Sequence, residues 1–292
     1  MQGLSADELD RRLREFLAED VGSGDVTTDS IVPAQVRASG EIVAKSDCVV
    51  SGLSVSRRVF ELLDPHLEWD ERGEPSAGTT VPGGTALARL SGKARAILTG
   101  ERVALNLLQR MCGIATATRR YVDAVAGTGC RVLDTRKTPP GLRAFDRAAV
   151  RDGGGVNHRA GLFDMVLVKD NHRAIAGGVK SALEAVRRSA RADLKVEVEV
   201  ESEQDLREAI AGGADVLLID NQSPTTVRRW VDIARKGPRS PAIEASGNIT
   251  LANARDYALA GVDSISIGAL THSVTAADLS LEMALVPAGG RR

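Results

Sequence analysis

The second half of the chain alternates short apolar runs with amphipathic segments of helical period. The apolar runs are residues 131–133, 165–168, 196–200, 216–219, 242–243 and 264–267, and the amphipathic segments are residues 175–191, 202–211, 224–236 and 251–260. Gly212-Gly213, Gly237 and Gly261 close three of these segments, as glycines do at helix C-termini. Alternating strands and helices predict a parallel sheet, and at least six such units favour a closed α/β barrel over an open sheet.

The first part of the chain has no such regular alternation. Ser5 and Glu8 form a capping-box pattern, which predicts a helix that begins there and runs to about Leu17. The remaining expected elements are a loop at 20–25, strands within 37–50, a helix at 53–63, a hairpin over 79–90 with a Pro-Gly-Gly turn, and a long helix at 93–111. This mixture indicates an α/β region that differs in plan from the repeating units after residue 131.

Residues 195–201 form the most informative predicted strand, because valine alternates there with charged residues. Side chains alternate between the two faces of a strand, so the valines share one face and the charges the other. If the valines face outer helices, Glu197 and Glu199 point into the barrel. An exposed antiparallel edge strand would show the same pattern, but the flanking helical segments favour the barrel. Buried carboxylates need a cation or a hydrogen-bonding partner.

Nearly every predicted strand ends in ionisable or glycine residues. These ends carry Asp134, Arg136 and Lys137, residues 169–172, Glu199 and Glu201, Asp220 and Asn221, Glu244 with residues 246–248, and Gly268. In α/β barrels the chemistry lies at the carboxyl ends of the strands. The pattern therefore predicts a site at this end of the sheet.

Positive charge is concentrated between residues 136 and 169. The cations of this stretch are Arg136, Lys137, Arg143, Arg147, Arg151, His158, Arg159 and Lys169, with three glycines at 153–155 in the middle. Glycines let the backbone approach a ligand closely, and converging cations suit an anionic small molecule. A basic, flexible surface loop is the alternative interpretation.

Glu101 falls within the apolar stripe of the long helix at 93–111, and Arg102 lies at its edge. A charge in such a stripe costs free energy unless it is paired or faces a ligand or partner. An internal Glu–Arg pair is the simpler explanation, and contact with a second molecule is the other.

Composition excludes several broad classes of protein. The 292 residues carry 38 basic and 39 acidic side chains, and aromatics make up only 3%, which argues against a general nucleic-acid-binding role. The three cysteines are far apart, show no zinc-ligand spacing and fit a reducing compartment. The chain has no signal-peptide pattern and no apolar run long enough to span a membrane, so we expect a cytoplasmic protein.

Cations, inward carboxylates and small turns together suggest a phosphorylated, pyrophosphate-bearing sugar as substrate. Mg²⁺ bridges phosphates to one or two carboxylates and prefers oxygen ligands. Ser246, Gly247, Asn248 and Gly268 could hold a phosphate with backbone N–H groups.

Several segments, in order along nearly the whole chain, resemble the quinolinate phosphoribosyltransferase family. They are Gly24–Thr27 (GDVT), Gly100–Leu108 (GERVALNLL), Gly113–Thr116 (GIAT), Leu133–Arg143 (LDTRKTPPGLR), Gly153–Arg159 (GGGVNHR), Val168–His172 (VKDNH), Ile219–Asn221 (IDN), Glu244–Asn248 (EASGN) and Ser266–Ser273 (SIGALTHS). The resemblance implies a nicotinate-nucleotide pyrophosphorylase (carboxylating), a transferase of NAD biosynthesis.

The resemblance implies an N-terminal open-faced α/β sandwich at residues 1–112 and an incomplete, six- or seven-stranded α/β barrel at 113–272, the type II phosphoribosyltransferase fold, with residues 273–292 packing back on the N-terminal domain. It also implies a homodimer in which the N-terminal domain of one subunit closes the barrel of the other, with higher oligomers left open. The expected small-molecule partners are quinolinate and phosphoribosyl pyrophosphate, with Mg²⁺ and no organic cofactor.

The resemblance assigns roles to residues of this sequence. Arg102 would reach the neighbouring active site. The two substrate carboxylates would be bound by Arg136, His158, Arg159 and Lys169, and Lys137 would lie between the substrates. Mg²⁺ and the ribose hydroxyls would be held by Glu199 and Asp220, and the 5′-phosphate by Ser246, Gly247, Asn248 and Gly268, with His272 nearby. Lys137, Lys169, Glu199 and Asp220 form the implied catalytic set.

The sequence departs from the usual family pattern at several positions, and none of them removes an expected charged ligand. They are Pro139, Cys112, Ala148 within residues 145–150, and the 45–48 turn that ends in Cys48. Two other activities remain open: a paralogous pyrophosphorylase of the molybdate-transport-associated type with a different acid or base, and a Schiff-base lyase that uses Lys169.

Overall fold

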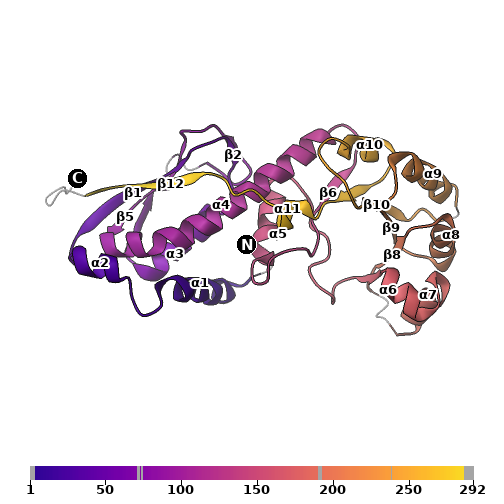
Figure 1. The fold of residues 1–292 in the computed structure, drawn as a ribbon, viewed down its shortest axis with the longest axis horizontal. Coiled ribbons are helices and arrows are strands. Elements are labelled where there is room, and N and C mark those ends of the chain that lie inside the picture. Colours follow the sequence, from indigo (N-terminus) through magenta and orange to yellow (C-terminus); the bar gives the residue numbers. More distant parts are fainter. Residues whose placement is uncertain (1–3, 71–72, 74, 190–192, 238, 286–292) are drawn as a thin grey trace. The chain divides into compact units, whose positions relative to one another are not determined.

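The computed structural model describes residues 4–70, 73, 75–189, 193–237 and 239–285. Its contacts divide the chain into two compact units (Figure 1). The first unit comprises Met1–Arg119, Thr138–Gly154 and Thr271–Arg292, and the second comprises Arg120–Lys137 and Gly155–Leu270. The expected boundary at residue 112 falls inside one long helix, α4 (Ala94–Ala124), which exceeds the predicted 93–111.

A four-stranded antiparallel sheet of order β12-β1-β5-β3 forms the first unit's framework. The strands are β1 (Arg37–Ala44), β3 (Glu68–Asp70), β5 (Ala86–Lys93) and β12 (Leu279–Leu285). The last strand pairs with β1 over residues 279–285, so the chain returns to this sheet after leaving the second unit; residues 286–292 of the predicted C-terminal segment lie outside the described part.

The predicted hairpin over residues 79–90 is wrong. β4 (Thr80–Val81) pairs with β2 (Cys48–Val49), whereas β5 pairs with β1 and β3. The Pro-Gly-Gly turn carries the chain from one sheet to the other: Gly83 N donates to Asp47 Oδ1 (2.9 Å) and Gly84 N to Ala44 O (2.7 Å). These bonds tie the turn to the end of β1, which local sequence does not reveal.

The helices of this unit are α1 (Ala6–Val21), α2 (Val26–Ile31), α3 (Leu53–Leu63), α4 and α5 (Arg143–Asp152). Ser5 caps α1 by accepting from Glu8 N at 3.2 Å, as predicted, but the helix continues beyond Leu17 to Val21. Asp25, placed in a loop by the sequence, caps α2. One apolar core joins α1, α3, α4 and α5 to the sheet through fully buried side chains such as Phe60, Leu108 and Phe145.

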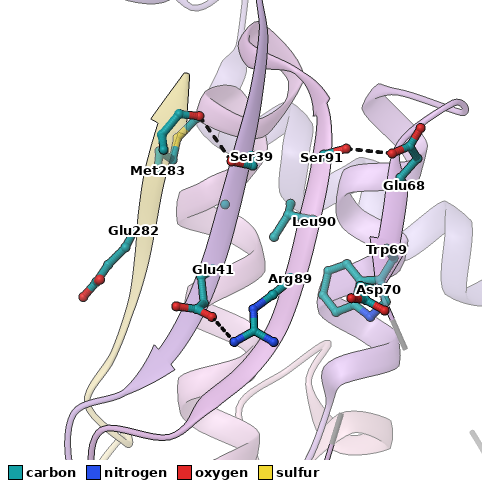
Figure 2. Close-up of a pocket in the computed structure, with 12 residues that line it drawn as sticks. Ser39, Glu41, Glu68, Trp69, Asp70, Arg89, Leu90, Ser91, Glu282 and Met283 are labelled. Atoms are coloured by element: carbon teal, nitrogen blue, oxygen red, sulfur yellow. Dashed lines mark hydrogen bonds and ion pairs between the residues drawn. The ribbon is translucent and has the colours of Figure 1, made fainter. Parts of the chain in front are cut away.

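The other face of the sheet bears a shallow concavity of about 750 Å³, shown in Figure 2. Its charges are matched by close neighbours: Arg89 pairs with Glu41 at 2.6 Å, and Ser91 Oγ donates to Glu68 Oε2 at 2.9 Å. Because cross-strand partners satisfy these groups, the concavity is a solvated sheet surface.

The second unit is built on six parallel strands in the order β6-β11-β10-β9-β8-β7. They are β6 (Arg131–Leu133), β7 (Val166–Val168), β8 (Val196–Val200), β9 (Val216–Asp220), β10 (Ala242–Ser246) and β11 (Ser264–Ser266). Every predicted strand is thus confirmed, and the α/β fold class is confirmed as an incomplete barrel.

The closed ring suggested by the apolar pattern is wrong, because β6 and β7 stand at opposite ends of the strand order. The residues between these two strands are all described; they include residues 138–154, which belong to the first unit, and none of them forms a further strand. Val156 makes an isolated bridge to the β6 edge: its N–H donates to Val132 O (2.8 Å), and its carbonyl accepts from Asp134 N (3.2 Å).

The remaining helices are α6 (Asp170–Ala176), α7 (Val179–Ser189), α8 (Glu203–Gly212), α9 (Pro224–Arg235), α10 (Ala254–Leu259) and the short α11 (Ala269–His272). The single helix predicted at 175–191 is wrong: Gly177 and Gly178 adopt φ of +83° and +118° and separate α6 from α7, and residues 190–191 lie outside the described part. Among the described residues, no helix is long and apolar enough to cross a membrane.

Candidate active site

A pocket of about 560 Å³ opens at the carboxyl ends of the parallel strands, where the sequence predicts it. Its lining combines cations, carboxylates and small polar residues from all six strands or the loops after them. The lining residues are Thr135, Arg136, Lys137, His158, Arg159, Leu167, Lys169, Asp170, Glu199, Leu218, Asp220, Asn221, Glu244, Ser246, Gly247, Asn248 and Ser266. Ten of the thirteen residues expected in the site are in this list.

One side of the pocket is cationic. Arg136 and Lys137 follow β6, Lys169 follows β7, and Arg159 comes from the loop between these strands. Burial lowers the pKa of Arg159, because it disfavours the charged guanidinium, and the positive charge of Arg136 lowers it further by repulsion. The guanidinium group donates to Met165 O at 3.3 Å. This side of the pocket suits a ligand with more than one negative charge.

The facing side carries carboxylates from β8 and β9. Glu199 is 6% exposed, which confirms that it points inward, and its Oε2 lies 3.3 Å from Lys169 Nζ. Carboxylate oxygens of Glu199, Glu201 and Asp220 lie within 4.8 Å of one another. Glu201 is already engaged by Arg173 at 2.8 Å, which leaves Glu199 and Asp220 facing the pocket. An all-oxygen donor pair of this kind fits Mg²⁺.

A tight turn after β10 forms the third part of the pocket. Gly247 has φ +88°, and a Cβ there would overlap Asn221 Oδ1 and lie 3.0 Å from Asn221 N. Asn221 itself adopts φ +54° and donates its N–H to Ser246 O at 2.9 Å, while Asn248 Nδ2 donates to Asn221 Oδ1 at 3.1 Å. The turn therefore requires glycine at position 247. Asn221 supports this turn through its contacts with Ser246 and Asn248, whereas the sequence placed it at a strand end and gave it no role.

His158 forms part of the pocket floor and is held by its neighbours. The buried Asp134 accepts from His158 N (2.7 Å) and from Asn157 Nδ2 (2.6 Å). Arg159 N donates to His158 Nδ1 at 2.7 Å. His158 Nε2 lies 3.1 Å from Glu197 Oε2 and 3.6 Å from Glu244 Oε2.

The titration of this cluster is strongly perturbed. Burial lowers the pKa of His158, but Glu197 and Glu244 raise it by more, so the net direction is upward. Burial, with the charge of Glu197, raises the pKa of Glu244 to about 7.

Three expected residues are not in the pocket lining. Gly268 follows β11 within the second unit, but the lining formed by the described residues does not include it. Arg102 is exposed on α4, and His272, with Nδ1 2.6 Å from Ser273 Oγ, is also exposed; both belong to the first unit.

Sequence analysis missed the part played by Glu244 and Ser266. The sequence placed both residues in predicted strands and identified Glu244 as a charge near a strand end. Nothing in the local pattern indicates that Glu244 lies close to Glu197 of β8 and to His158. Only the strand order, which places β9 between β8 and β10, brings these residues to one end of one sheet.

The fold and the pocket define an α/β-barrel protein with a site for a polyanionic small molecule. Two family models match the chain: the quinolinate phosphoribosyl transferase N-terminal domain over residues 25–112 and the corresponding C-terminal domain over residues 114–282. The chain belongs to the quinolinate phosphoribosyltransferase family.

Several curated relatives and solved structures match this chain over nearly their whole lengths. The probable nicotinate-nucleotide pyrophosphorylase [carboxylating] of Bacillus subtilis is 43% identical, with 95% of this chain and 94% of that protein covered. The nicotinate-nucleotide pyrophosphorylase [carboxylating] of Mycobacterium leprae is 41% identical, with coverage of 93% and 95%. The structure of NadC from Streptococcus pyogenes superposes with a TM-score of 0.92 at 36% identity, covering 98% of this chain and all of that one.

Proposed function

We propose that the protein transfers the phosphoribosyl group of phosphoribosyl pyrophosphate to the ring nitrogen of quinolinate, giving nicotinate mononucleotide, CO₂ and pyrophosphate. The observation that carries the proposal is the pocket at the strand ends, where a cationic side faces a carboxylate side. The names of the full-length relatives support the same reaction.

The cationic side is assigned to the acid substrate. Arg136, Arg159 and Lys169 offer three positive charges to the two carboxylates of quinolinate, and an arginine fork suits bidentate carboxylate binding. His158 lines the pocket beside them. It would be the fourth residue to contact the two carboxylates, while the three cations supply most of the positive charge.

The carboxylate side is assigned to Mg²⁺ and the ribose. Glu199 and Asp220 would hold the ion, which supplies positive charge to the pyrophosphate leaving group when bound. Lys137, between the two sides, would stabilise the same developing charge. The turn at Ser246, Gly247 and Asn248, with Gly268 and His272, would hold the 5′-phosphate through backbone N–H and side-chain groups.

The chemistry follows from charge development. The pyridine nitrogen forms a bond to ribose C1 as the C1–oxygen bond to pyrophosphate breaks, through a cationic, oxocarbenium-like transition state that a nearby carboxylate such as Glu199 offsets. The product ring is a pyridinium. Its 2-carboxylate leaves as CO₂, its bonding electrons remain at C2 where the adjacent N⁺ stabilises them, and a proton from solvent completes nicotinate mononucleotide.

The proposal includes a cytoplasmic homodimer with shared sites. Residues 1–112 and the returning C-terminal segment would form the accessory domain, and residues 113–272 the catalytic domain. Arg102, exposed on α4, would enter the pocket of the second subunit and contact a substrate carboxylate. This role would explain why an exposed arginine lies at the edge of an apolar stripe.

A substrate comparison tests the reaction. Enzyme, Mg²⁺ and phosphoribosyl pyrophosphate are incubated separately with quinolinate, nicotinate and phthalate, and pyrophosphate release is followed. We expect turnover with quinolinate, none with nicotinate, which lacks the second carboxylate, and none with phthalate, which keeps both carboxylates but has no ring nitrogen to attack ribose C1. Turnover with another acid but not with quinolinate would favour the paralogous pyrophosphorylase. Borohydride trapping of a carbonyl substrate on Lys169 would instead identify the Schiff-base activity.

A further inference from the structure

Three carboxylates lie close together at the ends of β8 and β9, but only two of them line the pocket. One oxygen from each of Glu199, Glu201 and Asp220 lies within 4.8 Å of the other two. The pocket lining formed by the described residues includes Glu199 and Asp220 but not Glu201. Side chains two apart on a strand share a face, so one more residue of β8 would turn Glu201 inward beside Glu199. The contacts of Glu201 outside the pocket therefore decide whether it joins the other two.

Arg173 on α6 makes the main contact with Glu201. Its Nη2 lies 2.8 Å from Glu201 Oε2, and its Nη1 lies 2.8 Å from Asp205 Oδ2 on α8. Arg173 is only 9% exposed, and a buried arginine stays charged and needs a carboxylate partner. One carboxylate is enough for that balance. The second contact, with Glu201, therefore does more than neutralise Arg173.

Asp205 anchors the guanidinium group from the side of α8. Ser202 Oγ donates to Asp205 Oδ2 at 2.8 Å and accepts from Asp205 N at 3.1 Å. These bonds cap the first turn of α8 and restrict the Asp205 carboxylate. The Glu201 side chain, by contrast, is 48% exposed. Of the two partners of Arg173, Glu201 is the one whose position depends on the arginine.

Lys169, at the start of the same helix α6, behaves differently from Arg173. Lys169 Nζ lies 3.3 Å from Glu199 Oε2, and the lysine side chain is 47% exposed. The Arg173 side chain is 11% exposed and has a second carboxylate partner. Lys169 can therefore leave Glu199 when a ligand or an ion enters the pocket, whereas Arg173 stays on Glu201.

We propose, on the basis of the Mg²⁺ site in the proposed function, that Arg173 is a positioning residue that withholds Glu201 from the ion. The protein then supplies two carboxylates, Glu199 and Asp220, and other positions on the ion stay open to water and phosphate oxygens, as Mg²⁺ prefers. A third carboxylate would take one of these positions and add negative charge beside a polyanionic substrate. Arg173 thus favours binding of the ion together with phosphoribosyl pyrophosphate over binding of the ion alone.

Metal binding by the full-length protein without substrates tests the proposal. Mn²⁺, which takes the same oxygen ligands as Mg²⁺, is titrated while electron paramagnetic resonance follows the unbound ion. Arg173→Met removes the charge and releases Glu201, so Mn²⁺ should bind about tenfold more tightly than to the parent, because the site gains a charged ligand. Arg173→Met combined with Glu201→Gln should return the affinity to within about twofold of the parent.

A merely structural role of Arg173 predicts a different pattern. A loosened strand end would weaken Mn²⁺ binding, and removal of the Glu201 charge would not restore it. Arg207→Met is the matched control, because it breaks an exposed pair with Glu203 on α8, and it should leave Mn²⁺ affinity unchanged. In steady-state kinetics, Arg173→Met should raise the KM for phosphoribosyl pyrophosphate about threefold or more and change the quinolinate KM less.

Glu201→Gln alone gives a result that does not require Arg173→Met to fold. Because Arg173 keeps Glu201 off the ion, Mn²⁺ affinity should stay within about twofold of the parent, whereas Asp220→Asn should lower it about tenfold or more. A loss for Glu201→Gln as large as that for Asp220→Asn would overturn the proposal. A folded Arg173→Met variant with unchanged or weaker Mn²⁺ binding would overturn it as well.

Failure of the proposed reaction is a separate result. The Mn²⁺ titration uses no organic substrate, so a lack of product from quinolinate would refute the reaction and leave the test of Arg173 intact. A parent protein that binds no Mn²⁺, or whose Mn²⁺ binding does not respond to Asp220→Asn, would exclude the positioning role of Arg173.

Discussion

Replacement of Arg110 by methionine should destabilise the first unit strongly. Arg110 on α4 holds Asp146 on α5 through two contacts of 2.8 Å and also donates to Thr271 O at 2.9 Å. Asp146 is 0% exposed. Removing one partner of a buried ion pair leaves an uncompensated charge, which costs about 3–5 kcal/mol. We expect a loss of this size in the free energy of unfolding at pH 7.

The pH dependence supplies an internal check. Burial raises the pKa of Asp146, and Arg110 partly offsets the shift, so the variant should have a still higher value. A carboxyl group whose folded-state pKa exceeds its unfolded value is destabilising when ionised, and that penalty shrinks as pH falls. Urea unfolding at about pH 7 and about pH 5 should therefore show a smaller difference between variant and parent at the lower pH.

Two controls sharpen the measurement. Arg11→Met breaks a solvent-exposed pair with Glu15, both about 60% exposed, and should cost less than about 0.5 kcal/mol. The double change Arg110→Met with Asp146→Leu removes both charges and should recover most of the loss. A cost below about 1 kcal/mol for Arg110→Met at pH 7, or a cost that does not change with pH, would refute the reasoning.

Three further predictions concern the pocket. Asp220→Asn should weaken Mg²⁺-dependent binding of phosphoribosyl pyrophosphate about tenfold or more and quinolinate binding far less in calorimetric titration; equal losses would count against a metal role. Gly247→Ala should impair binding of inorganic phosphate or ribose 5-phosphate, because the new Cβ meets Asn221; unchanged affinity would show that this turn does not hold the 5′-phosphate. Arg102→Ala should be nearly inactive yet folded, and mixing it with inactive Lys137→Ala should restore up to about a quarter of parental sites by random subunit exchange; verified heterodimers without recovery would exclude a shared site.

The sequence predicted the elements of the second unit well, because each strand there is a short apolar run between polar ends. β6 and β8 begin and end where the pattern places them. The same regularity predicted the active-site end of the sheet, since residues that follow parallel strands collect at one edge. The thirteen expected site residues came from the family resemblance, and ten of them line one pocket.

The errors share a physical cause: they depend on contacts between distant segments. Nothing in the sequence near Pro82 indicates that β4 and β5 belong to different sheets. Nothing in the sequence of α5 indicates that this helix belongs to the first unit, which leaves the barrel open between β6 and β7. The pairing of Glu244 with His158 likewise depends on strand order. Local patterns record propensity and burial, whereas these features are fixed by tertiary contacts.

Product stoichiometry tests the central claim most directly. Quinolinate labelled with ¹³C in its 2-carboxyl group is incubated with phosphoribosyl pyrophosphate, Mg²⁺ and the protein, and nicotinate mononucleotide, pyrophosphate and labelled CO₂ are measured together. The account predicts one equivalent of each product, with all of the label in CO₂. Pyrophosphate release without labelled CO₂, or no product from folded protein, would contradict it.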